Sequence, residues 1–570
     1  MRRFHPRRVL IPVLSLLFGA SNLADCANPP RDVAEFPDKP VIRQRPDGEL
    51  LAFFMRTLDG TQTVTVSTSP ETADNWSAER PLLALPKGVG GWGGPDCLID
   101  KRGNIHLIFL NDANTGVIPT GEENRPRAGS LHSRRLDIWH AKSTDGGATW
   151  KGPNKIWEGY TGALNSIIET SRGWIVLPFS CLTPRTWGNR GDGLDAFTFR
   201  GQFDSTVVYS EDGGETWKQS PTPLKVATPD IVSAYGAVEP VVLELKDGRI
   251  WMLIRTQLGR FYESFSKDGA EWSPPRPTAI LSSDSPGGIT RLPDGRIVLF
   301  WNNSLRFPYA YGGRQVLHAA ISEDEGRTWR GCREVARDPL RHEPPPPSGD
   351  HGTAYPFPTA LRNGKVIYTT GQGTSARILC RLLDPDWLLE TEQRADFSVG
   401  LDDWSVFGTR GVELIDTQDG NKALRIRKVE PGWPAAAVWN FPSGPKGTLT
   451  VRLHLEPGNR GYVVGLTDHY SVPFDEEDLF HNLFSLDLTS GISDGKPLLA
   501  EGKAYELRLS WDLNRRECRA ELDGVLISTL LLRRESGGVS YVRFRSVLNL
   551  DEREEGGLVI ESVEAKLEFP

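Results

Sequence analysis

The most regular pattern in the chain is a pair of short apolar runs on either side of a two-residue turn. The runs Val241–Leu245 and Ile250–Ile254 are rich in β-branched residues and flank Asp247-Gly248. Asp-Gly between two such runs is the strongest short-range signal for a β-hairpin, because a type I′ turn needs positive φ at both central residues. We therefore predict a hairpin with a type I′ turn at this position.

The same arrangement recurs along the first two thirds of the chain. Each further copy has an apolar strand, a tight turn that contains glycine, and a second apolar strand. These turns lie at Asp47-Gly48, Arg102-Gly103, Arg172-Gly173, Asp294-Gly295 and Asn363-Gly364. Together with Asp247-Gly248 they make six hairpins, so we predict six equivalent units over residues 33–390.

A second repeated motif, Ser-x-Asp-x-Gly-x-Thr-Trp, follows several of the hairpins. Its copies are Ser143–Trp150, Ser210–Trp217 and Ser322–Trp329, with a shorter copy at Ser266–Trp272 and a decayed one at Ser67–Trp76. From Ser143 onwards the copies start 67, 56 and 56 residues apart. Units of this length with about four strands each are typical of a β-propeller. We expect a structural motif, in which Ser and Asp bond backbone N–H groups and Trp packs into the blade.

Pairing residues across the turns brings polar side chains to one end of every predicted blade. Glu239 then lies beside Arg255, and Lys39 lies opposite Arg56. The same pairing groups Asp96 with Asn111 and Asp112, Asn165 with Ser180, Ser285 with Asn302 and Asn303, and Tyr355 with Gln372. A propeller has a central depression at such an end, so we predict a binding site there. A charge pair at a strand end is also a common rim salt bridge, and both interpretations of Glu239 and Arg255 stay open.

The repeated motif stops after Trp387, and short alternating strands cover residues 395–570. The predicted strands are Ala423–Ile426, Leu449–Leu455, Tyr505–Trp511, Cys518–Leu522 and Leu558–Leu567. Strand-only patterning over this length predicts a β-sandwich, and the region resembles jelly-roll or lectin-like modules. The predicted fold class is therefore all-β: a six-bladed β-propeller over 33–390 followed by a β-sandwich over 395–570.

Composition supports this architecture and limits the partners. A chain of 570 residues exceeds what one hydrophobic core supports, so at least two domains are expected. The 58 glycines and 17 tryptophans, with few long helical patterns, favour an all-β chain. The net charge of -8 argues against nucleic acid as a partner. The cysteines are scattered and lack C-x-x-C spacing, so we predict no metal site and no cofactor.

The N-terminus has the pattern of an export signal. Arg2, Arg3, Arg7 and Arg8 precede the apolar run Val9–Ala20, which is too short to span a bilayer as a mature helix. We predict a signal peptide over residues 1–27; a membrane anchor is the alternative. The predicted protein is exported, whether periplasmic, secreted or lipid-anchored at the cell surface. We expect a monomer with no membrane span in the mature chain.

The hairpins and motifs together resemble a known family. The Ser-x-Asp-x-Gly-x-Thr-Trp copies, Glu239-Pro240 before a hairpin and Arg255 sixteen residues after Glu239 are similar to the sialidase (neuraminidase) superfamily of six-bladed propellers. The resemblance covers most of residues 36–390. It implies a site in which three arginines bind a substrate carboxylate, a Tyr–Glu pair supplies the nucleophile and an Asp acts as acid/base.

The resemblance also implies roles for individual residues. Glu239 falls on the glutamate and Arg255 on the second arginine, while Arg314 precedes a repeated motif as the third arginine does. Tyr355, which opens the sixth hairpin, falls on the nucleophilic tyrosine. A carboxylate beside a phenol accepts the proton of the phenol as it attacks. Asp59 follows the first hairpin roughly where the family has its acid/base.

Asp96 is the second candidate for the acid/base, and the first arginine is where this chain departs from the family. Asp38-Lys39 stand immediately before Pro40, where the resemblance predicts an arginine. Lys39 or the facing Arg56 is expected to supply part of the missing charge, whereas Asp38 would repel a carboxylate. The predicted substrate-binding residues are accordingly Arg255, Arg314, Arg56, Asp96 and Asn302.

Three functional hypotheses follow. The leading one is an exported sialidase-like exo-glycosidase that removes a terminal acidic sugar with retention, and whose sugar need not be a sialic acid. The second is a non-catalytic glycan-binding propeller, favoured by the missing arginine and opposed by the Tyr–Glu pair. The third keeps an enzyme but changes its chemistry to hydrolysis or elimination on a uronic acid. Fold alone does not separate them, because function depends on the site.

Overall fold

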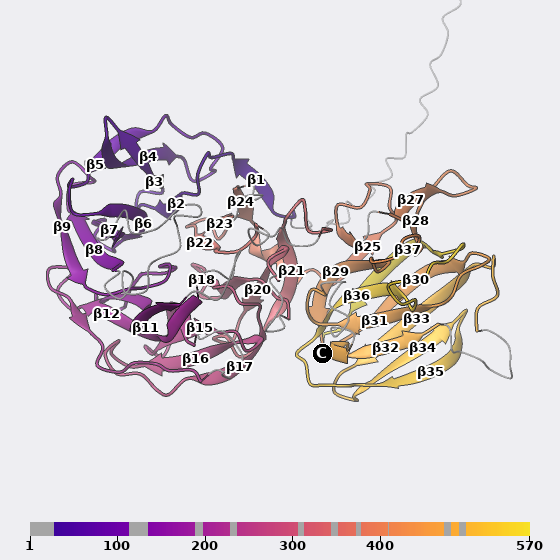
Figure 1. Cartoon of the computed structure of the whole chain (residues 1–570). Coiled ribbons are helices and arrows are strands. Elements are labelled where there is room, and N and C mark those ends of the chain that lie inside the picture. The colour runs from indigo at the N-terminus through magenta and orange to yellow at the C-terminus, as the bar shows by residue number, and fades with distance from the viewer. Residues whose placement is uncertain are drawn as a thin grey trace, which may run out of the picture.

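The computed structural model describes residues 28–112, 135–188, 198–227, 236–305, 313–343, 352–371, 378–407, 410–471, 480–488 and 498–569. The predicted export signal at 1–27 and Gln372 lie outside these residues. Two β-rich bodies are visible in Figure 1, a ring of small sheets and a pair of larger sheets beside it. The predicted all-β class, with a propeller followed by a sandwich, is confirmed.

The ring is built from antiparallel four-stranded units that follow one another along the chain (Figure 1). The first three are β2 (Val41–Gln44), β3 (Leu50–Leu58), β4 (Thr61–Ser69) and β5 (Arg80–Ala84); β6 (Gly91–Ile99), β7 (Ile105–Asp112), β8 (Asp137–Ser143) and β9 (Lys151–Trp157); and β10 (Ile168–Glu169), β11 (Ile175–Gly188), β12 (Thr198–Ser210) and β13 (Lys218–Gln219). The fourth and fifth are β14 (Val238–Glu244), β15 (Ile250–Arg255), β16 (Arg260–Ser266) and β17 (Arg276–Leu281); and β18 (Gly288–Arg291), β19 (Ile297–Trp301), β20 (Val316–Ser322) and β21 (Arg330–Arg337).

The sixth unit closes the ring with a strand from the other end of the propeller sequence. It contains β22 (Phe357–Ala360), β23 (Val366–Thr370), β24 (Leu379–Leu383) and, as its outermost strand, β1 (Arg31–Ala34). Because β1 pairs with β24, the N-terminal segment and the last blade are held together by backbone hydrogen bonds. Five of these units are separate sheets in the described residues, and the fifth blade continues into the second domain.

The hairpin turns have a different geometry from the one predicted at Asp247-Gly248. Gly248 has φ 82, whereas Asp247 is absent from the positive-φ residues of the described chain. The Gly248 N–H donates to the Leu245 carbonyl, and Leu245 N–H donates to Arg249 O. This is a longer turn with one left-handed glycine, so the type I′ prediction is wrong here. The wider turn places Val241 opposite Leu253 in the paired strands.

The repeated motif has the structural role predicted for it. In blade five, Ser322 Oγ donates to Asp324 Oδ1 at 2.9 Å, and the Gly326 N–H donates to Ser322 Oγ at 2.8 Å. Asp324 Oδ1 also accepts the Thr328 N–H at 2.8 Å, and Asp324 Oδ2 accepts the Thr328 hydroxyl at 2.6 Å. Gly326 has φ 80, and a Cβ there would lie 2.8 Å from the ring of Trp251. The motif therefore ties each turn to the neighbouring blade.

The second domain is a sandwich of two sheets around one apolar core. A short 3-10 helix η3 (Pro385–Leu389) leads into it from the propeller. One sheet contains β25 (Glu392–Ala395), β27 (Val412–Asp416), β28 (Lys422–Ile426), β30 (Lys446–Leu455), β33 (Tyr505–Asp512), β34 (Glu517–Leu522), β35 (Val525–Leu531) and β37 (Leu558–Leu567). The other contains β26 (Trp404–Phe407), β29 (Ala436–Gly444), β31 (Tyr462–Thr467), β32 (Phe484–Asp487) and β36 (Val539–Ser546). Trp404, Trp439 and Trp511 are buried between the sheets, which makes them core residues.

The second domain is joined to blade five of the propeller. Gly331 of β21 pairs with Ser443 of β29, so one sheet runs from the blade into the sandwich. Between the domains, Tyr541 is hydrogen-bonded to His318 and donates to Glu334 Oε1 at 2.7 Å. All three of these side chains are buried. Blade five and the sandwich therefore share both a sheet and a buried polar network.

The turn motif supplies a first prediction. Replacing Asp324 by alanine removes the hydrogen bonds from Ser322 and Thr328, and we expect a loss of about 1–3 kcal/mol in the free energy of unfolding. The measurement is the midpoint of urea unfolding. The matched control is Asp74→Ala in the decayed motif. Asp74 forms only a surface ion pair with Arg31, so we expect this variant to lose less than about 1 kcal/mol in the free energy of unfolding. Equal destabilisation by both variants would contradict the structural role of the intact motif.

Candidate active site

Glu239 lies at the start of β14 and is aimed by an irregularity in that strand. Val238 pairs with Arg255, and the register then shifts before Val241, so Glu239 lies in a bulge. Glu239 has φ 44, a left-handed conformation that costs energy for a residue with a side chain. Bulges re-aim side chains next to functional sites. The Glu239 side chain is buried, with 7% of the residue exposed.

Tyr355 meets Glu239 although the two residues are 116 positions apart in the chain. The Tyr355 hydroxyl donates to Glu239 Oε1 at 3.1 Å, and Arg255 donates to the same hydroxyl oxygen at 3.1 Å. Tyr355 has φ 58, so it shares with Glu239 a left-handed backbone conformation. The phenol therefore has a proton acceptor and a fixed cation on its oxygen.

Arg255 is held by two carboxylates. It forms an ion pair with Glu239, and its Nε donates to Asp284 Oδ1 at 2.7 Å. Asp284 Oδ2 accepts a hydrogen bond from Gln257 at 3.0 Å. Burial on its own lowers the pKa of Arg255, but Asp284 and Glu239 outweigh it and raise the pKa well above its usual value. Arg255 is therefore a permanent cation with a fixed orientation.

Two further cations lie close to the phenol ring. The Arg314 guanidinium carbon lies 5.6 Å from the centre of the Tyr355 ring, and Arg314 donates to the Asp284 carbonyl oxygen at 2.7 Å. Lys39 Nζ lies 5.4 Å from the same ring centre and donates to the Tyr355 carbonyl oxygen at 3.1 Å. Arg255, Arg314 and Lys39 therefore converge on one tyrosine.

A glycine in blade three permits the close packing around Glu239. The Ala163 N–H donates to Glu239 Oε1 at 3.2 Å. A Cβ built at Gly162 would lie 3.1 Å from Glu239 Cγ and 3.1 Å from Ser180 Oγ, which is tighter than ordinary contact. Residue 162 is therefore glycine because the backbone passes directly over the carboxylate.

Asp59 lies on an exposed turn at the end of β3. Asp59 and Gly60 have φ 49 and 70 and form the two-residue connection between β3 and β4, a type I′ turn. Asp59 is exposed to solvent. Asp59 follows β3, the second strand of blade one. Gln257 follows β15, the second strand of blade four, and lies beside the site, so Asp59 lies at the corresponding end of its own blade.

Arg56 is engaged with carboxylates at the rim. It forms ion pairs with Asp38 at 2.6 Å and with Glu79 at 2.7 Å. Arg56 therefore opposes the charge of Asp38, the residue that stands where the resemblance predicts the first arginine, but shares its own charge between two carboxylates. Arg56 therefore acts on the site through Asp38 in this structure.

Asp96 lies on β6 in the centre of the ring, next to Arg43 of β2. Asp96 Oδ1 accepts hydrogen bonds from Arg43 at 3.1 Å and from the Cys97 N–H at 2.7 Å. Asp96 Oδ2 has no hydrogen-bond partner among the described residues. Burial raises the pKa of Asp96, and Arg43 only partly opposes this. Arg43 also donates to Thr359 Oγ1 at 3.2 Å, so it links the inner strands of three blades.

Asn302 is fully buried and bonded within the protein. Its Nδ2 donates to the Val316 carbonyl at 2.8 Å and to Thr353 Oγ1 at 3.2 Å, and its Oδ1 accepts from Ser285 at 2.8 Å. Thr353 in turn donates to the Arg314 carbonyl at 2.5 Å. Asn302 therefore joins the segments that carry Arg314 and Tyr355.

Sequence reasoning did not identify four residues that the structure places in or beside the site: Asp284, Gln257, Gly162 and Arg43. Asp284 directly precedes Ser285, which the hairpin pairing places at the mouth, so the position of Ser285 was the available signal for Asp284. Gln257 and Gly162 lie in connections that carry no strand pattern. Arg43 alternates with Val41 on β2, and this period of two is the available signal.

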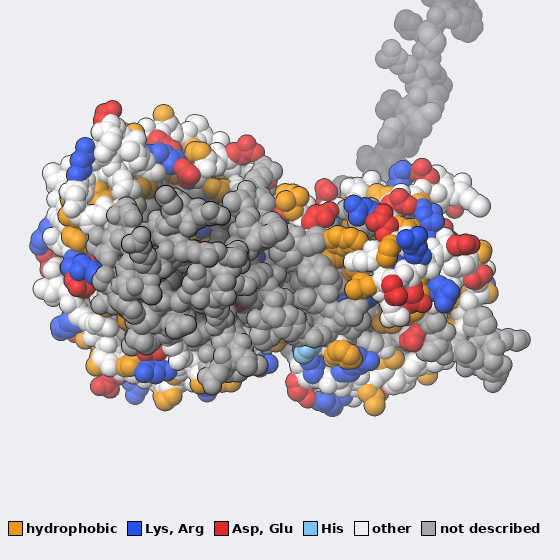
Figure 2. Space-filling view, viewed as in Figure 1, with side chains coloured by type: hydrophobic (Ala, Val, Ile, Leu, Met, Phe, Trp, Pro, Cys, Tyr) orange, Lys and Arg blue, Asp and Glu red, His pale blue; other side chains and the backbone are white. Residues whose placement is uncertain are grey.

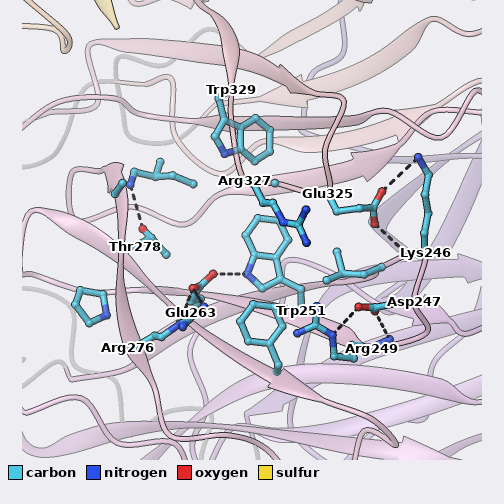
Figure 3. Close-up of a pocket in the computed structure, with 16 residues that line it drawn as sticks. Lys246, Asp247, Arg249, Trp251, Glu263, Arg276, Thr278, Glu325, Arg327 and Trp329 are labelled. Atoms are coloured by element: carbon cyan, nitrogen blue, oxygen red, sulfur yellow. Dashed lines mark hydrogen bonds and ion pairs between the residues drawn. The ribbon is translucent and has the colours of Figure 1, made fainter. Parts of the chain in front are cut away.

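A separate hollow, whose lining does not include Tyr355, lies between blades four and five (Figure 3). It has a volume of about 650 Å³ and is lined by the turn between β14 and β15, by β16 and β17 and by the motif of blade five. Its charges are largely paired, since Glu263 contacts Trp251 and Arg276, and Lys246 contacts Glu325. Its lining residues include no tyrosine, so it offers no Tyr–Glu pair.

Other kinds of site were not found in the residues that the structure describes. No group of three or more His, Cys, Asp or Glu side chains there is placed to hold a metal ion. None of the helices in those ranges is long and apolar enough to cross a bilayer. Figure 2 shows acidic and basic side chains interspersed over the visible face of the C-terminal domain. Ion pairs of this domain include Lys422–Asp416 and Arg425–Glu413.

Comparison with protein families identifies the repeated region. The model of the BNR repeat-like domain matches residues 40–368, more than half of the chain. A sialidase of Micromonospora viridifaciens is 22% identical over 530 residues, which cover 83% of this chain and 76% of the relative. A sialidase of Bacteroides fragilis is 25% identical over 296 residues, covering 48% of this chain and 49% of the relative.

Among solved structures, the chain is similar to a Trypanosoma rangeli sialidase in complex with 2,3-difluorosialic acid, described as a covalent intermediate. The TM-score is 0.40 and the identity 14%, with 93% of this chain and 91% of that chain covered. These values concern the fold alone.

The surroundings of Tyr355 predict its ionisation. Burial raises the pKa of Tyr355 to about 12, with Glu239 adding to the rise and Arg255 opposing it. An ordinary tyrosine is about half ionised near pH 10. We therefore expect the ultraviolet difference spectrum between the wild type and Tyr355→Phe to show no phenolate absorbance from residue 355 up to pH 10.5. A phenolate signal with a midpoint near pH 10 would contradict this environment.

Proposed function

The chain belongs to the BNR repeat-like family, and from that premise we propose that it is a sialidase-like exo-glycosidase. It removes a terminal acidic sugar from a glycan with retention of configuration. The observation that carries the proposal is the hydrogen bond from the Tyr355 hydroxyl to Glu239, within reach of Arg255. The relatives that are called sialidases support the same class of substrate.

The Tyr–Glu pair suits a nucleophilic role. Tyr355 Oη attacks the anomeric carbon and transfers its proton to Glu239 Oε1, while the acid/base aspartate protonates the leaving oxygen as its bond to that carbon breaks. The same aspartate, now ionised, takes a proton from the water that attacks the anomeric carbon; the bond to Tyr355 breaks, and the Tyr355 oxygen regains its proton from Glu239. A neutral phenol also approaches a sugar that bears a carboxylate without charge repulsion, as in the tyrosine-using exceptions to the two-carboxylate rule. The raised pKa keeps Tyr355 neutral until attack.

Arg255 and Arg314 are proposed to bind the carboxylate of the sugar. Arginine presents paired N–H donors that match a carboxylate. Asp284 fixes both residues, since it accepts from Arg255 through its side chain and from Arg314 through its carbonyl. Asn302 is proposed to position this arrangement, and Arg56 to oppose the charge of Asp38 at the rim.

Two aspartates are proposed for the acid/base. Asp59 is at the mouth end of blade one and free to approach a bound glycan, which favours it. Asp96 has the raised pKa that a general acid needs and an unbonded oxygen, but it lies on an inner strand beside Arg43. We keep Asp59 as the first candidate because a leaving group departs toward solvent.

The Tyr–Glu pair also bears on the two rival functions. A module that only binds glycans gains nothing from a hydrogen-bonded phenol and carboxylate whose backbones both carry strain. Elimination on a uronic acid would use the phenol as a base, and the product then contains a double bond.

We further propose that the protein acts after export and as a monomer, with the sandwich over 395–570 as an accessory domain to the propeller over 33–390.

The nucleophile is tested by Tyr355→Phe. We expect kcat for release of an acidic sugar to fall by about a thousandfold or more, because the covalent step is lost. Tyr368→Phe is the matched control, since its buried hydroxyl in blade six bonds the Val335 carbonyl. The anomeric configuration of the first product is followed by proton NMR. Unchanged activity in Tyr355→Phe, or an inverted product, would refute the mechanism.

The acid/base is tested by Asp59→Asn and Asp96→Asn on two substrates. Loss of a general acid slows a glycan with a poor leaving group by about 10²–10⁴-fold, but slows an aryl glycoside with an acidic leaving group much less. We expect this difference for Asp59→Asn. If only Asp96→Asn shows this difference, Asp96 is the acid/base. If both variants hydrolyse both substrates at the wild-type rate, neither residue is the acid/base.

A further inference from the structure

Lys39 occupies the same place in its blade as the two central residues of the site. Lys39, Glu239 and Tyr355 each stand eight residues before the first residue of the hairpin turn, at positions 47, 247 and 363. The repeat therefore brings the three residues to the same end of blades one, four and six, at or just before the inner strands β2, β14 and β22. The arginine that the resemblance predicts one position earlier is Asp38 in this chain.

The contacts of Lys39 hold its ammonium group at the nucleophile. Nζ donates to the Tyr355 carbonyl oxygen at 3.1 Å and lies 5.4 Å from the Tyr355 ring centre and 4.8 Å from that of Phe357. The carbonyl is the one hydrogen-bond acceptor of Lys39 within the described residues, and an ammonium group has three donors. Two N–H donors therefore remain for a ligand.

Several charged groups gather around the Tyr355 ring. Three cations, Lys39, Arg255 and Arg314, face two carboxylates, Glu239 and Asp284. These groups lie in a partly buried site, where electrostatic interactions are stronger than in water. Asp38 points to a different partner, since it pairs with Arg56, which also pairs with Glu79.

We propose that Lys39 is the third cation that binds the carboxylate of the acidic sugar, in place of the arginine that is missing at position 38. The inference rests on the proposed function, because it takes an acidic sugar as the ligand. Lys39 also positions the nucleophile, since its hydrogen bond fixes the carbonyl of a tyrosine that has φ 58.

A lysine in this role makes binding depend on pH. Burial lowers the pKa of Lys39 to about 8, and the negative charge of Glu239 opposes the shift only in part. The cation is present below pH 8 and is lost as the pH rises through that value. The other groups that face it are Tyr355, whose pKa is about 12, and the arginines Arg255 and Arg314. Carboxylate binding therefore weakens on the alkaline side through Lys39.

The test measures binding rather than turnover, so it is separate from the test of catalysis. N-acetylneuraminate and glucuronate are titrated calorimetrically into the wild type, Lys39→Met and Lys39→Arg between pH 6.5 and 9.5. We expect Lys39→Met to raise Kd about ten- to hundredfold at pH 6.5 for the acid that binds. The methyl ester of that acid should lose little affinity, because it lacks the charge.

Lys39→Arg distinguishes the effect of the charge on Lys39 from any effect of the substitution on folding. An arginine stays protonated over this range, so this variant should bind at pH 6.5 as the wild type does and lose the weakening that the wild type shows at pH 9.5. Lys246→Met, a lysine at the opposite end of blade four, is the charge control. The inference is overturned by equal affinity of Lys39→Met and wild type, by alkaline weakening that persists in Lys39→Arg, or by a wild type that binds neither acid. Loss of turnover with intact binding would instead refute the proposed catalysis alone.

Discussion

The site depends on one buried carboxylate that serves two partners. Glu239 forms an ion pair with Arg255 and accepts a hydrogen bond from the Tyr355 hydroxyl; Glu239 and Arg255 are buried and Tyr355 is partly buried. Removing one member of a buried pair leaves an uncompensated charge, so each residue constrains the others. Left-handed conformations at Glu239 and Tyr355 cost about 1–3 kcal/mol each, and blades four and six must hold them in place. The propeller is thus a frame that maintains strained strand ends.

The frame itself was largely predictable, because it arises from local patterns. Alternation with a period of two, glycine turns and the Ser-x-Asp-x-Gly-x-Thr-Trp motif identified the blades and the sandwich. The turn at Asp247-Gly248 was predicted wrongly, since Asp-Gly also occurs in a longer turn with a single left-handed glycine. The true two-residue turns include Asp59-Gly60, so the same dipeptide adopts both geometries. Which one forms depends on strand register, which the dipeptide does not encode.

The site was predictable residue by residue but not as an arrangement. Glu239, Arg255 and Tyr355 were each placed at the mouth, yet the bulge that aims Glu239 depends on packing against the segment around Gly162 in blade three. Asp284 was missed because a connection before β18 carries no periodic signal. The Lys39 contact with the Tyr355 carbonyl joins the two ends of the propeller sequence, 316 residues apart. Ring closure, rather than local pattern, produces such contacts.

The second domain is attached to the blade that carries part of the site. Blade five supplies Arg314 and the segment with Asp284, and it is also the blade whose sheet continues into the sandwich through Gly331 and Ser443. Asn303 donates to the Asp468 carbonyl at 2.8 Å, and its neighbour Asn302 bonds the segments that carry the site residues. The sandwich therefore restrains the one blade that presents Arg314 and Asp284 together. A domain fused at this blade affects how rigidly Arg314 and Asp284 are held, even though no hydrogen bond or ring contact joins its side chains to Tyr355 within the described residues.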